Sequence, residues 1–283
     1  MDWDSPLISR LIDSWIEEDL GTGDLTATII KKDYGKAEWI SKEEGIFCGS
    51  EVIKRIFNKI DSKIDIKFLK EDGTLFFKND RILELNGSPK SLLAGERITL
   101  NIAMHLSGIS TYTNKLVRKL NGTKIYLADT RKTTPGLRKL EKYAFKCGGG
   151  INHRMGLYDA AMIKENHIAW SEDLIDCVKN IRENTPFTTH IIIEAENMIQ
   201  ARDAILAGAD SILLDEIEPE ILNKNIQLLR DLINKNRKRC MLEVSGIKPE
   251  EIENYLIEGV DLISTSASVT KSNWIDLSMR YIN

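Results

Sequence analysis

The sequence predicts an α/β protein in which a small N-terminal sheet region precedes an incomplete, open α/β barrel. The chain has 283 residues, which is longer than most single domains, so we expect two domains. Short alternating runs separated by turns occupy residues 35–87, with turns at Asp72-Gly73 and Asn86-Gly87. After residue 120, six short apolar runs alternate with helical stretches, which is typical of parallel strands with helices outside. Six strands are too few for a complete eightfold barrel, so an open one fits better.

The N-terminal region is expected to begin and end with a helix. Ser5-Pro6 has the pattern of an N-cap followed by a first helical residue, and apolar residues recur at helical spacing up to Ile16. The first helix should therefore end near Gly21. A long helix is expected from residue 91 to about residue 120, with a candidate break at Gly108. The strands between the helices are expected at residues 37–40, 64–68 and 81–85.

Each predicted barrel strand is followed by residues suited to binding or catalysis. These strands are expected at residues 125–128, 160–163, 190–193, 211–214, 240–244 and 262–264. In α/β barrels the functional side chains come from the carboxyl ends of the strands and the loops that follow them. Here cations follow the first two strands and carboxylates follow the next two, so both signs of charge should converge on one mouth.

Composition excludes several classes of protein. A hydrophobic content of 42% and a charged content of 29% are those of an ordinary globular chain, and no run approaches the roughly 18 apolar residues that span a bilayer. The first residues lack the pattern of a signal peptide, so we expect a cytoplasmic protein with no membrane contact. The net charge of −4 argues against general nucleic-acid binding.

The cysteines give no sign of a metal site. Cys48, Cys147, Cys177 and Cys240 are far apart and form no C-x-x-C pair, so neither a zinc site nor a disulfide framework is indicated. We expect reduced, mostly buried thiols.

One basic segment stands out in this acidic chain. Residues 131–154 contain seven Lys or Arg against one acid, Glu141, which suggests a local anion site. The alternative is a solvated helix face, and that is the interpretation we favour for Lys139, Lys142 and Lys146.

Two parts of this segment suit an anionic ligand. Arg131 supplies a planar fork for a carboxylate and Lys132 a compact charge, although an ordinary exposed loop is the alternative. The glycine run at residues 148–150 would let backbone approach a ligand beside His153 and Arg154. Taken alone, His153 is more often a structural histidine.

The acidic and small residues suggest how a phosphorylated sugar could be held. Glu194 and Asp215 end adjacent strands, where two carboxylates could hold Mg²⁺ directly or through water or substrate phosphates. They could also stabilise positive charge developing at a sugar carbon, and simple solvation is the alternative. Ser245-Gly246 and residues 264–268 are suited to a phosphate cradle, a weak signal by itself.

Several motifs in the chain closely resemble the quinolinate phosphoribosyltransferase family, and the resemblance extends over almost the whole sequence. The motifs are Glu18 to Thr26, Gly95 to Asn101, Asp129 to Arg138, Glu141 to Ala144, Gly148 to Arg154, Leu157 to Asp159, Ile163 to His167, Ala207 to Asp210 and Gly259 to Ser264.

The resemblance implies a fold and an assembly. The fold would be an N-terminal α/β sandwich, residues 1–112 completed by residues 272–283, beside an incomplete α/β barrel, residues 113–271. The family works as a homodimer or larger assembly, in which the sandwich of one subunit covers the barrel mouth of its neighbour.

The resemblance also implies roles for individual residues. Quinolinate and phosphoribosyl pyrophosphate would be the substrates, and Mg²⁺ the cofactor. Lys132, Glu194 and Asp215 would be catalytic, with Glu194 and Asp215 facing the ribose and Mg²⁺-pyrophosphate. The positions that hold the quinolinate carboxylates and neighbouring phosphates are matched by Arg97, Arg131, Lys132, His153, Arg154 and Lys164. Ser245, Gly246, Ser264 and Ser266 would take part in holding phosphate, and Arg97 would act across the subunit interface.

Two positions depart from the commonest family pattern. Glu216 stands where an Asn often follows the second acidic residue, and residues 265–271 replace a glycine expected in the last phosphate loop. Two other functions remain open. One is a pyrophosphorylase-like protein associated with molybdenum transport, to which Thr265-Ser266-Ala267 is similar, and the other is a silent phosphate-binding relative on the same fold.

Overall fold

The computed structural model describes residues 1–171, 173–236 and 239–282, and it divides into two compact units. Unit 1 contains Met1–Asn114, Thr134–Gly149 and Ser268–Asn283, whereas unit 2 contains Lys115–Thr133 and Gly150–Ala267. The predicted first domain is residues 1–112 together with residues 272–283. The observed unit 1 differs from it chiefly because it also contains residues 134–149. Residues 172, 237, 238 and 283 of the predicted ranges lie outside the described residues.

Unit 1 is a four-stranded antiparallel sheet covered by helices. Its elements are α1 (Pro6–Leu20), a short 3-10 helix (Leu25–Ile29), β1 (Gly35–Ser41), β2 (Gly45–Ile46), α2 (Ser50–Ile60), β3 (Asp65–Phe68), β4 (Leu75–Phe76), β5 (Arg81–Gly87), most of α3 (Pro89–Lys119), α4 (Arg138–Cys147) and β12 (Leu277–Ile282). The strand order is β12-β1-β5-β3. The C-terminal strand therefore pairs with β1, in a register that places Trp39 opposite Met279.

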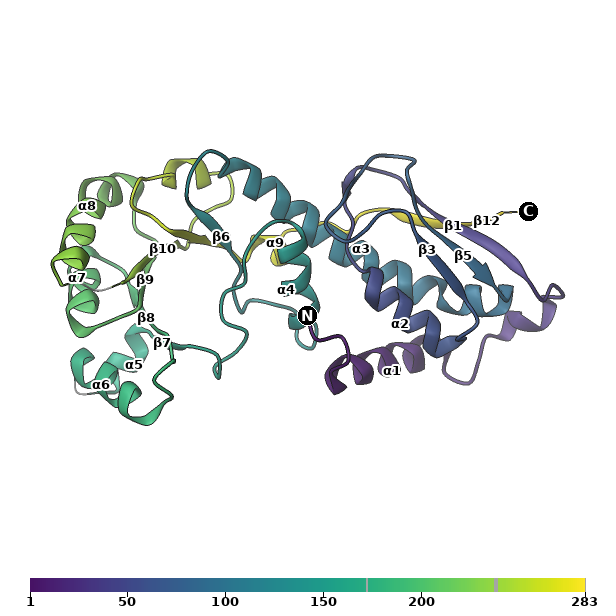
Figure 1. Ribbon diagram of the computed structural model, residues 1–283, viewed down its shortest axis with the longest axis horizontal. Helices are drawn as coiled ribbons and strands as arrows, with labels where there is room; N and C mark the ends of the chain where they lie inside the picture. The colour runs from purple at the N-terminus through teal and green to yellow at the C-terminus, as the bar shows by residue number, and fades with distance from the viewer. Residues whose placement is uncertain (172, 237–238, 283) are drawn as a thin grey trace. The chain divides into compact units, whose positions relative to one another are not determined.

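The core of unit 1 lies between this sheet and helices α2 and α3, which cover one face of it (Figure 1). Trp39 and Leu83 from the sheet are fully buried together with Phe57 from α2. Burying aromatic side chains of this size contributes about 2–3 kcal/mol each. The predicted helix α1 and strands β1, β3 and β5 are confirmed.

Helix α3 runs unbroken through Gly108, so the expected candidate break at this residue is wrong. A Cβ at Gly108 would lie 2.2 Å from the backbone oxygen of Asn273. The glycine is needed because the C-terminal segment crosses the helix here at close range, and the helix continues because a glycine in its interior weakens a helix without ending it.

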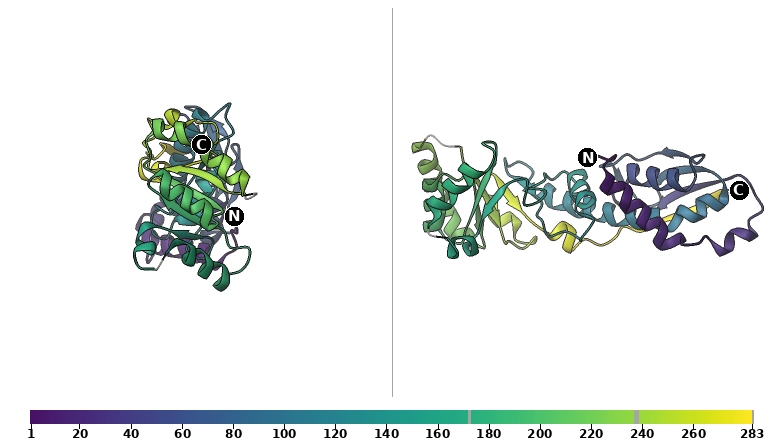
Figure 2. Two further views of the ribbon diagram at one scale, coloured as in Figure 1. Left: turned by 90° about the vertical axis from the view of Figure 1, so that its left-hand side faces the viewer. Right: turned by 90° about the horizontal axis from the view of Figure 1, so that it is seen from below.

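Unit 2 is a six-stranded parallel sheet with helices outside it. Its elements are β6 (Tyr126–Ala128), β7 (Ala161–Ile163), α5 (Glu165–Ala169), α6 (Leu174–Asn184), β8 (Ile191–Ala195), α7 (Met198–Ala207), β9 (Ser211–Asp215), α8 (Pro219–Lys235), β10 (Met241–Ser245), a short 3-10 helix (Ile252–Tyr255) and β11 (Leu262–Ser264), followed by α9 (Ala267–Thr270) at the boundary with unit 1. The left view of Figure 2 looks from the side of α7 and α8, and these helices lie in front of the strands.

The sheet of unit 2 is open. Its order is β6-β11-β10-β9-β8-β7, so within the described residues β6 and β7 are its edges and do not pair with each other. The predicted six strands and open barrel are confirmed. The same described ranges hold no helix that is both long and apolar enough to cross a bilayer.

Around helix α4 the structure differs from two expectations about the basic segment, the solvent exposure of Lys142 and the role of Gly148. Lys142 is only 1% exposed, so it does not lie on a solvated face as expected, whereas Lys146 does. Gly148 is required by packing, because a Cβ there would lie 2.4 Å from the Ser110 backbone oxygen. The Ser110 hydroxyl also donates to the Ala144 carbonyl oxygen at 2.8 Å, which ties the end of α4 to α3. These contacts group residues 134–149 with unit 1.

Candidate functional site

A cavity of about 300 Å³ lies at the carboxyl ends of the barrel strands in unit 2. Most residues predicted for the site line it, namely Arg131, Lys132, His153, Arg154, Lys164, Glu194, Asp215, Ser245 and Ser264. The remaining lining residues are Asp129, Thr130, Met162, Leu213 and Glu243.

The parallel register brings these side chains together. Ile163 of β7 lies opposite Ile193 of β8, so the residues that follow them in the chain, Lys164 and Glu194, reach the same edge. Asp215 lies opposite Ser245 in the same way. Since all six strands run in one direction, the residues that end them gather on one side of the sheet.

The cationic side of the cavity centres on Arg154. Its guanidinium donates to the Ala160 carbonyl oxygen at 2.9 Å and to the Met162 sulfur at 3.4 Å, both of which are uncharged acceptors. Burial, and then the charge of Arg131, lower the pKa of Arg154 below its usual value. Two guanidinium groups near enough to repel each other in a partly buried cavity are suited to an anionic ligand.

His153 is oriented by the protein on several sides. Its Nδ1 accepts the backbone N–H of Arg154 at 2.8 Å, so the proton of the neutral ring lies on Nε2, which is 3.3 Å from a carboxylate oxygen of Glu243. The His153 backbone N–H and the Asn152 amide donate to the two oxygens of Asp129, at 2.8 and 2.7 Å. His153 was predicted to bind substrate, and the structure directs its ring proton to Glu243.

Asp129 and Glu243 are site residues that the sequence analysis missed. Both are at most 3% exposed. Asp129 was visible as the residue directly after a predicted strand. Glu243 gave a different signal, a charged residue inside an otherwise apolar strand, which is rarely fully buried unless it is paired.

Lys164 and Glu194 form an ion pair across the mouth of the cavity. The Lys164 side chain is 43% exposed and the Glu194 side chain 11%. Each therefore lies within reach of a ligand while partly neutralising the other.

Asp215 differs from the other acidic residues of the cavity. Within the part of the chain that the structure describes, its carboxylate makes no hydrogen bond or ion pair to protein. Gly246 allows this arrangement, because a Cβ on it would lie 3.1 Å from Asp215 Oδ1 and 2.5 Å from Glu216 Cγ. Gly246 and Glu216 both have left-handed backbones, with φ values of 76° and 52°.

The predicted phosphate-binding serines differ in their surroundings. Ser264 is 3% exposed, and its hydroxyl has no hydrogen-bond partner among the described residues, although it lines the cavity. Buried hydroxyls are normally paired, so this one is suited to a ligand oxygen. Ser245 also lines the cavity, whereas Ser266 lies in the turn after β11 and is not part of the lining.

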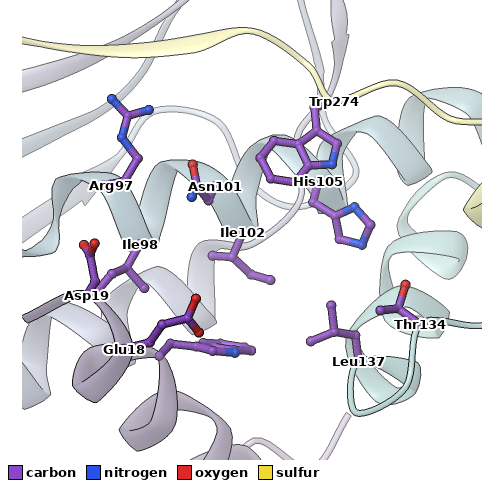
Figure 3. Close-up of a pocket in the computed structure, with 11 residues that line it drawn as sticks. Glu18, Asp19, Arg97, Ile98, Asn101, Ile102, His105, Thr134, Leu137 and Trp274 are labelled. Atoms are coloured by element: carbon purple, nitrogen blue, oxygen red, sulfur yellow. The ribbon is translucent and has the colours of Figure 1, made fainter. Parts of the chain in front are cut away.

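Arg97 lines a different cavity, of about 380 Å³, within unit 1. Figure 3 shows Arg97, Asn101 and His105 on successive turns of α3, with Glu18 and Asp19 of α1 across the cavity. His105 Nε2 lies 3.0 Å from the buried carboxylate of Glu141. Among the cationic residues predicted for the site, Arg97 alone belongs to unit 1. Its role therefore depends on what binds to the face of unit 1 that carries this cavity.

The acidic residues fit a hard divalent cation in part. Asp215 offers a carboxylate that no described residue occupies, and Mg²⁺ prefers such oxygen ligands together with water and phosphate oxygens. Glu194 would have to share its carboxylate with Lys164.

Comparison with known proteins identifies the family. Residues 24–107 match the model of the quinolinate phosphoribosyl transferase N-terminal domain, and residues 109–280 match that of its C-terminal domain. The chain is 39% identical over 273 residues to a Bacillus subtilis protein named "Probable nicotinate-nucleotide pyrophosphorylase (carboxylating)", covering 96% of this chain and 92% of that protein. It is 35% identical to a Synechocystis protein of the same name, covering 98% and 93%.

A solved structure agrees with the sequence matches. The nicotinate-nucleotide pyrophosphorylase from Francisella tularensis superposes with a TM-score of 0.90 at 37% identity, covering 98% of this chain and 96% of that one. These matches span both units and nearly the full length of each relative. The chain therefore belongs to the quinolinate phosphoribosyl transferase family.

Proposed function

We propose that this protein transfers the phosphoribosyl group of phosphoribosyl pyrophosphate to quinolinate, releasing pyrophosphate and carbon dioxide and forming nicotinate mononucleotide. The observation that carries the proposal is the division of charge in the barrel cavity. Arg154 lies there beside Arg131 and donates to uncharged acceptors, while Asp215 presents a carboxylate that no described residue pairs. A dianionic ring and a sugar that becomes cationic during the reaction need this combination of charges.

The cations would bind and orient quinolinate. Arg131, Lys132 and Arg154 supply charged donors for its two carboxylates, with Arg offering two parallel N–H groups to one carboxylate. Partial burial of the cavity strengthens these contacts, because the charges are poorly screened by water. Holding the ring nitrogen against the ribose carbon converts a bimolecular step into an effectively unimolecular one.

The carboxylates would stabilise the positive charge that develops on the ribose. The bond from the ribose carbon to pyrophosphate breaks, and the pyridine nitrogen forms the new bond to that carbon. The neighbouring carboxylate leaves as carbon dioxide, its bonding electron pair passes to the ring carbon, and a solvent proton takes its place. Glu194 and Asp215 would act electrostatically, and no covalent enzyme intermediate is needed.

The phosphate groups would be held at the ends of the last strands. The Ser264 hydroxyl lacks a described protein partner and would donate to a phosphate oxygen, together with Ser245 and backbone beside Gly246. Asp215, with Glu194, would hold Mg²⁺, which when bound would supply positive charge to offset that of the pyrophosphate.

The test is formation of nicotinate mononucleotide from quinolinate, phosphoribosyl pyrophosphate and Mg²⁺, with nicotinate as an alternative acceptor. Product from quinolinate and none from nicotinate supports the proposal. Asp215→Asn should lose most of the activity, whereas Arg202→Met, at an exposed position on α7, should keep it. Folded protein that forms no product from quinolinate would contradict the proposal.

We further propose a homodimer or larger assembly in which Arg97 of one subunit completes the site of another. Arg97 lies on α3 in unit 1, whereas the other proposed cations lie in unit 2. Arg97→Ala and Lys132→Ala should each be inactive alone, and mixing them should restore part of the activity through hybrid assemblies. No recovery after confirmed subunit exchange would contradict the shared site.

A further inference from the structure

Two cysteines and one carboxylate from distant parts of the sequence meet in unit 1. The Sγ atoms of Cys48 and Cys147 and a carboxylate oxygen of Asp72 all lie within 4.8 Å of one another. Cys48 lies between β2 and α2, Asp72 between β3 and β4, and Cys147 is the last residue of α4. None of them lines the barrel cavity or the Arg97 cavity.

The two cysteines are held in place by the surrounding backbone. Cys48 is fully buried, and its N–H donates to the Ser107 hydroxyl of α3 at 3.0 Å. Gly73 has a left-handed φ of 86°, and a Cβ there would lie 3.4 Å from the Cys147 backbone oxygen. The turn that carries Asp72 therefore approaches the end of α4 closely, which keeps the carboxylate near both sulfurs.

The Asp72 carboxylate is oriented by three donors. One oxygen accepts the backbone N–H groups of Gly49 and Ser50 at 3.0 and 2.9 Å, and the other accepts the Tyr143 hydroxyl at 2.8 Å. Hydrogen bonds of this kind commonly orient a carboxylate that binds a metal.

We propose that Cys48, Cys147 and Asp72 bind one thiophilic divalent metal ion of the zinc class. Two thiolates and a carboxylate are ligands that zinc accepts, and in a tetrahedral site with Zn–S bonds of about 2.3 Å the two sulfurs lie about 3.8 Å apart. The observed cluster needs only small side-chain movements to reach this geometry. Three protein ligands leave the fourth position for water, and the partly exposed Cys147 provides a route for the ion.

Metal binding would offset the negative charge of this cluster, because as ligands the three groups are two thiolates and one carboxylate in a largely buried space. A disulfide would join the two sulfurs but make no use of the carboxylate, so a metal accounts for more of the arrangement.

The experiment is a titration of the full-length, reduced protein with Co²⁺, followed by displacement with Zn²⁺. One Co²⁺ per chain with thiolate-to-cobalt charge-transfer absorbance, lost on adding Zn²⁺, is the expected result. The double variant Cys177→Ser/Cys240→Ser removes the two other cysteines and should keep the signal.

Three variants locate the site. Cys147→Ser changes a partly exposed position and should abolish the charge-transfer signal while the protein stays folded by circular dichroism. Asp72→Asn can still accept the Gly49 and Ser50 N–H groups and should weaken binding, and Tyr143→Phe should weaken it about tenfold through loss of the orienting hydrogen bond.

Two outcomes would overturn the proposal. One is that the folded, reduced wild-type protein binds no Co²⁺, or that the Cys147→Ser variant binds Co²⁺ as well as the wild type does. The other is a failure to bind Co²⁺ combined with rapid formation of a Cys48–Cys147 disulfide in the presence of a small-molecule disulfide oxidant, which would assign the pair to redox chemistry. Neither outcome depends on quinolinate turnover, so the metal site and the proposed function can fail separately.

Discussion

Lys164, directly after β7, and Glu194, near the end of the neighbouring parallel strand β8, form an ion pair at the mouth of the barrel cavity. The pair is partly exposed, so its own contribution to stability is at most about 1 kcal/mol. Its two members were assigned different roles, Lys164 toward quinolinate and Glu194 toward the ribose. Substitutions in the two should therefore have different kinetic consequences.

Glu194→Gln should lower kcat by about 10²-fold with little change in the KM for quinolinate, because a charge that stabilises the transition state is removed. Lys164→Met should chiefly raise the KM for quinolinate. Steady-state kinetics and melting temperatures of both variants are the measurement. If both variants lose kcat and melting temperature to the same extent, the pair is only structural.

Arg154→Met should raise the KM for quinolinate by roughly 10–100-fold, since a charged hydrogen bond contributes about 1.5–3 kcal/mol. Arg154→Lys should recover part of the loss, because it restores the charge without the planar fork. Arg202→Met is the matched control on an exposed helix face. An unchanged KM in Arg154→Met would remove this residue from the binding site.

Glu243 should act by positioning His153. Glu243→Ala leaves the His153 Nε2–H without its carboxylate partner, at a cost of about 1–3 kcal/mol, and should lower kcat/KM by about tenfold or more. Glu243→Gln retains a carbonyl oxygen that accepts this proton and should restore most of the activity. Equal losses in the two variants would show that the charge of Glu243, and not its hydrogen bond, is what matters.

Glu216→Asn should raise the melting temperature. Glu216 has a φ of 52°, a left-handed conformation that costs a residue such as Glu about 1 kcal/mol and that Asn adopts more readily. Glu196→Asn, at an exposed position without a positive φ, is the control. A Glu216→Asn protein no more stable than this control would show that the strain is relieved elsewhere.

His190 should make stability fall as the pH drops below about 6.5. Burial lowers the pKa of His190 below its usual value of 6.5, so the unfolded chain takes up a proton at a higher pH than the folded one. The stabilisation is present above pH 6.5 and is lost as the pH falls through the lowered value. Carboxyl groups with a lowered pKa, such as Glu141, lose their contribution only below their usual 4.5.

Urea unfolding between pH 7.5 and 5.5 measures this dependence in the wild type and in His190→Gln. The variant cannot take up a proton at this position, so its free energy of unfolding should change less over this range. An identical pH dependence in both proteins would assign the effect to another group.

The six barrel strands, their parallel direction and the helices between them could be predicted from the sequence, whereas their order in the sheet came from the structure. Short apolar runs such as residues 191–195 alternate with amphipathic helices, and that rhythm alone favours parallel strands that end on one edge. The same rule placed Arg131, Lys164, Glu194 and Asp215 on one cavity, because it depends only on where each residue falls relative to its strand.

The tertiary structure decided what depends on distance through space. Pairing of Glu243 with His153, burial of Lys142 and the meeting of Cys48 with Cys147 join residues whose spacing in the chain carries no periodic signal. The local sequence determined the elements and their ends, since propensity and hydrophobic pattern act over a few residues. Only packing decided which charges are neutralised and which thiols are neighbours. The energy of a buried charge or thiol depends on its burial and on partners that other strands and helices supply.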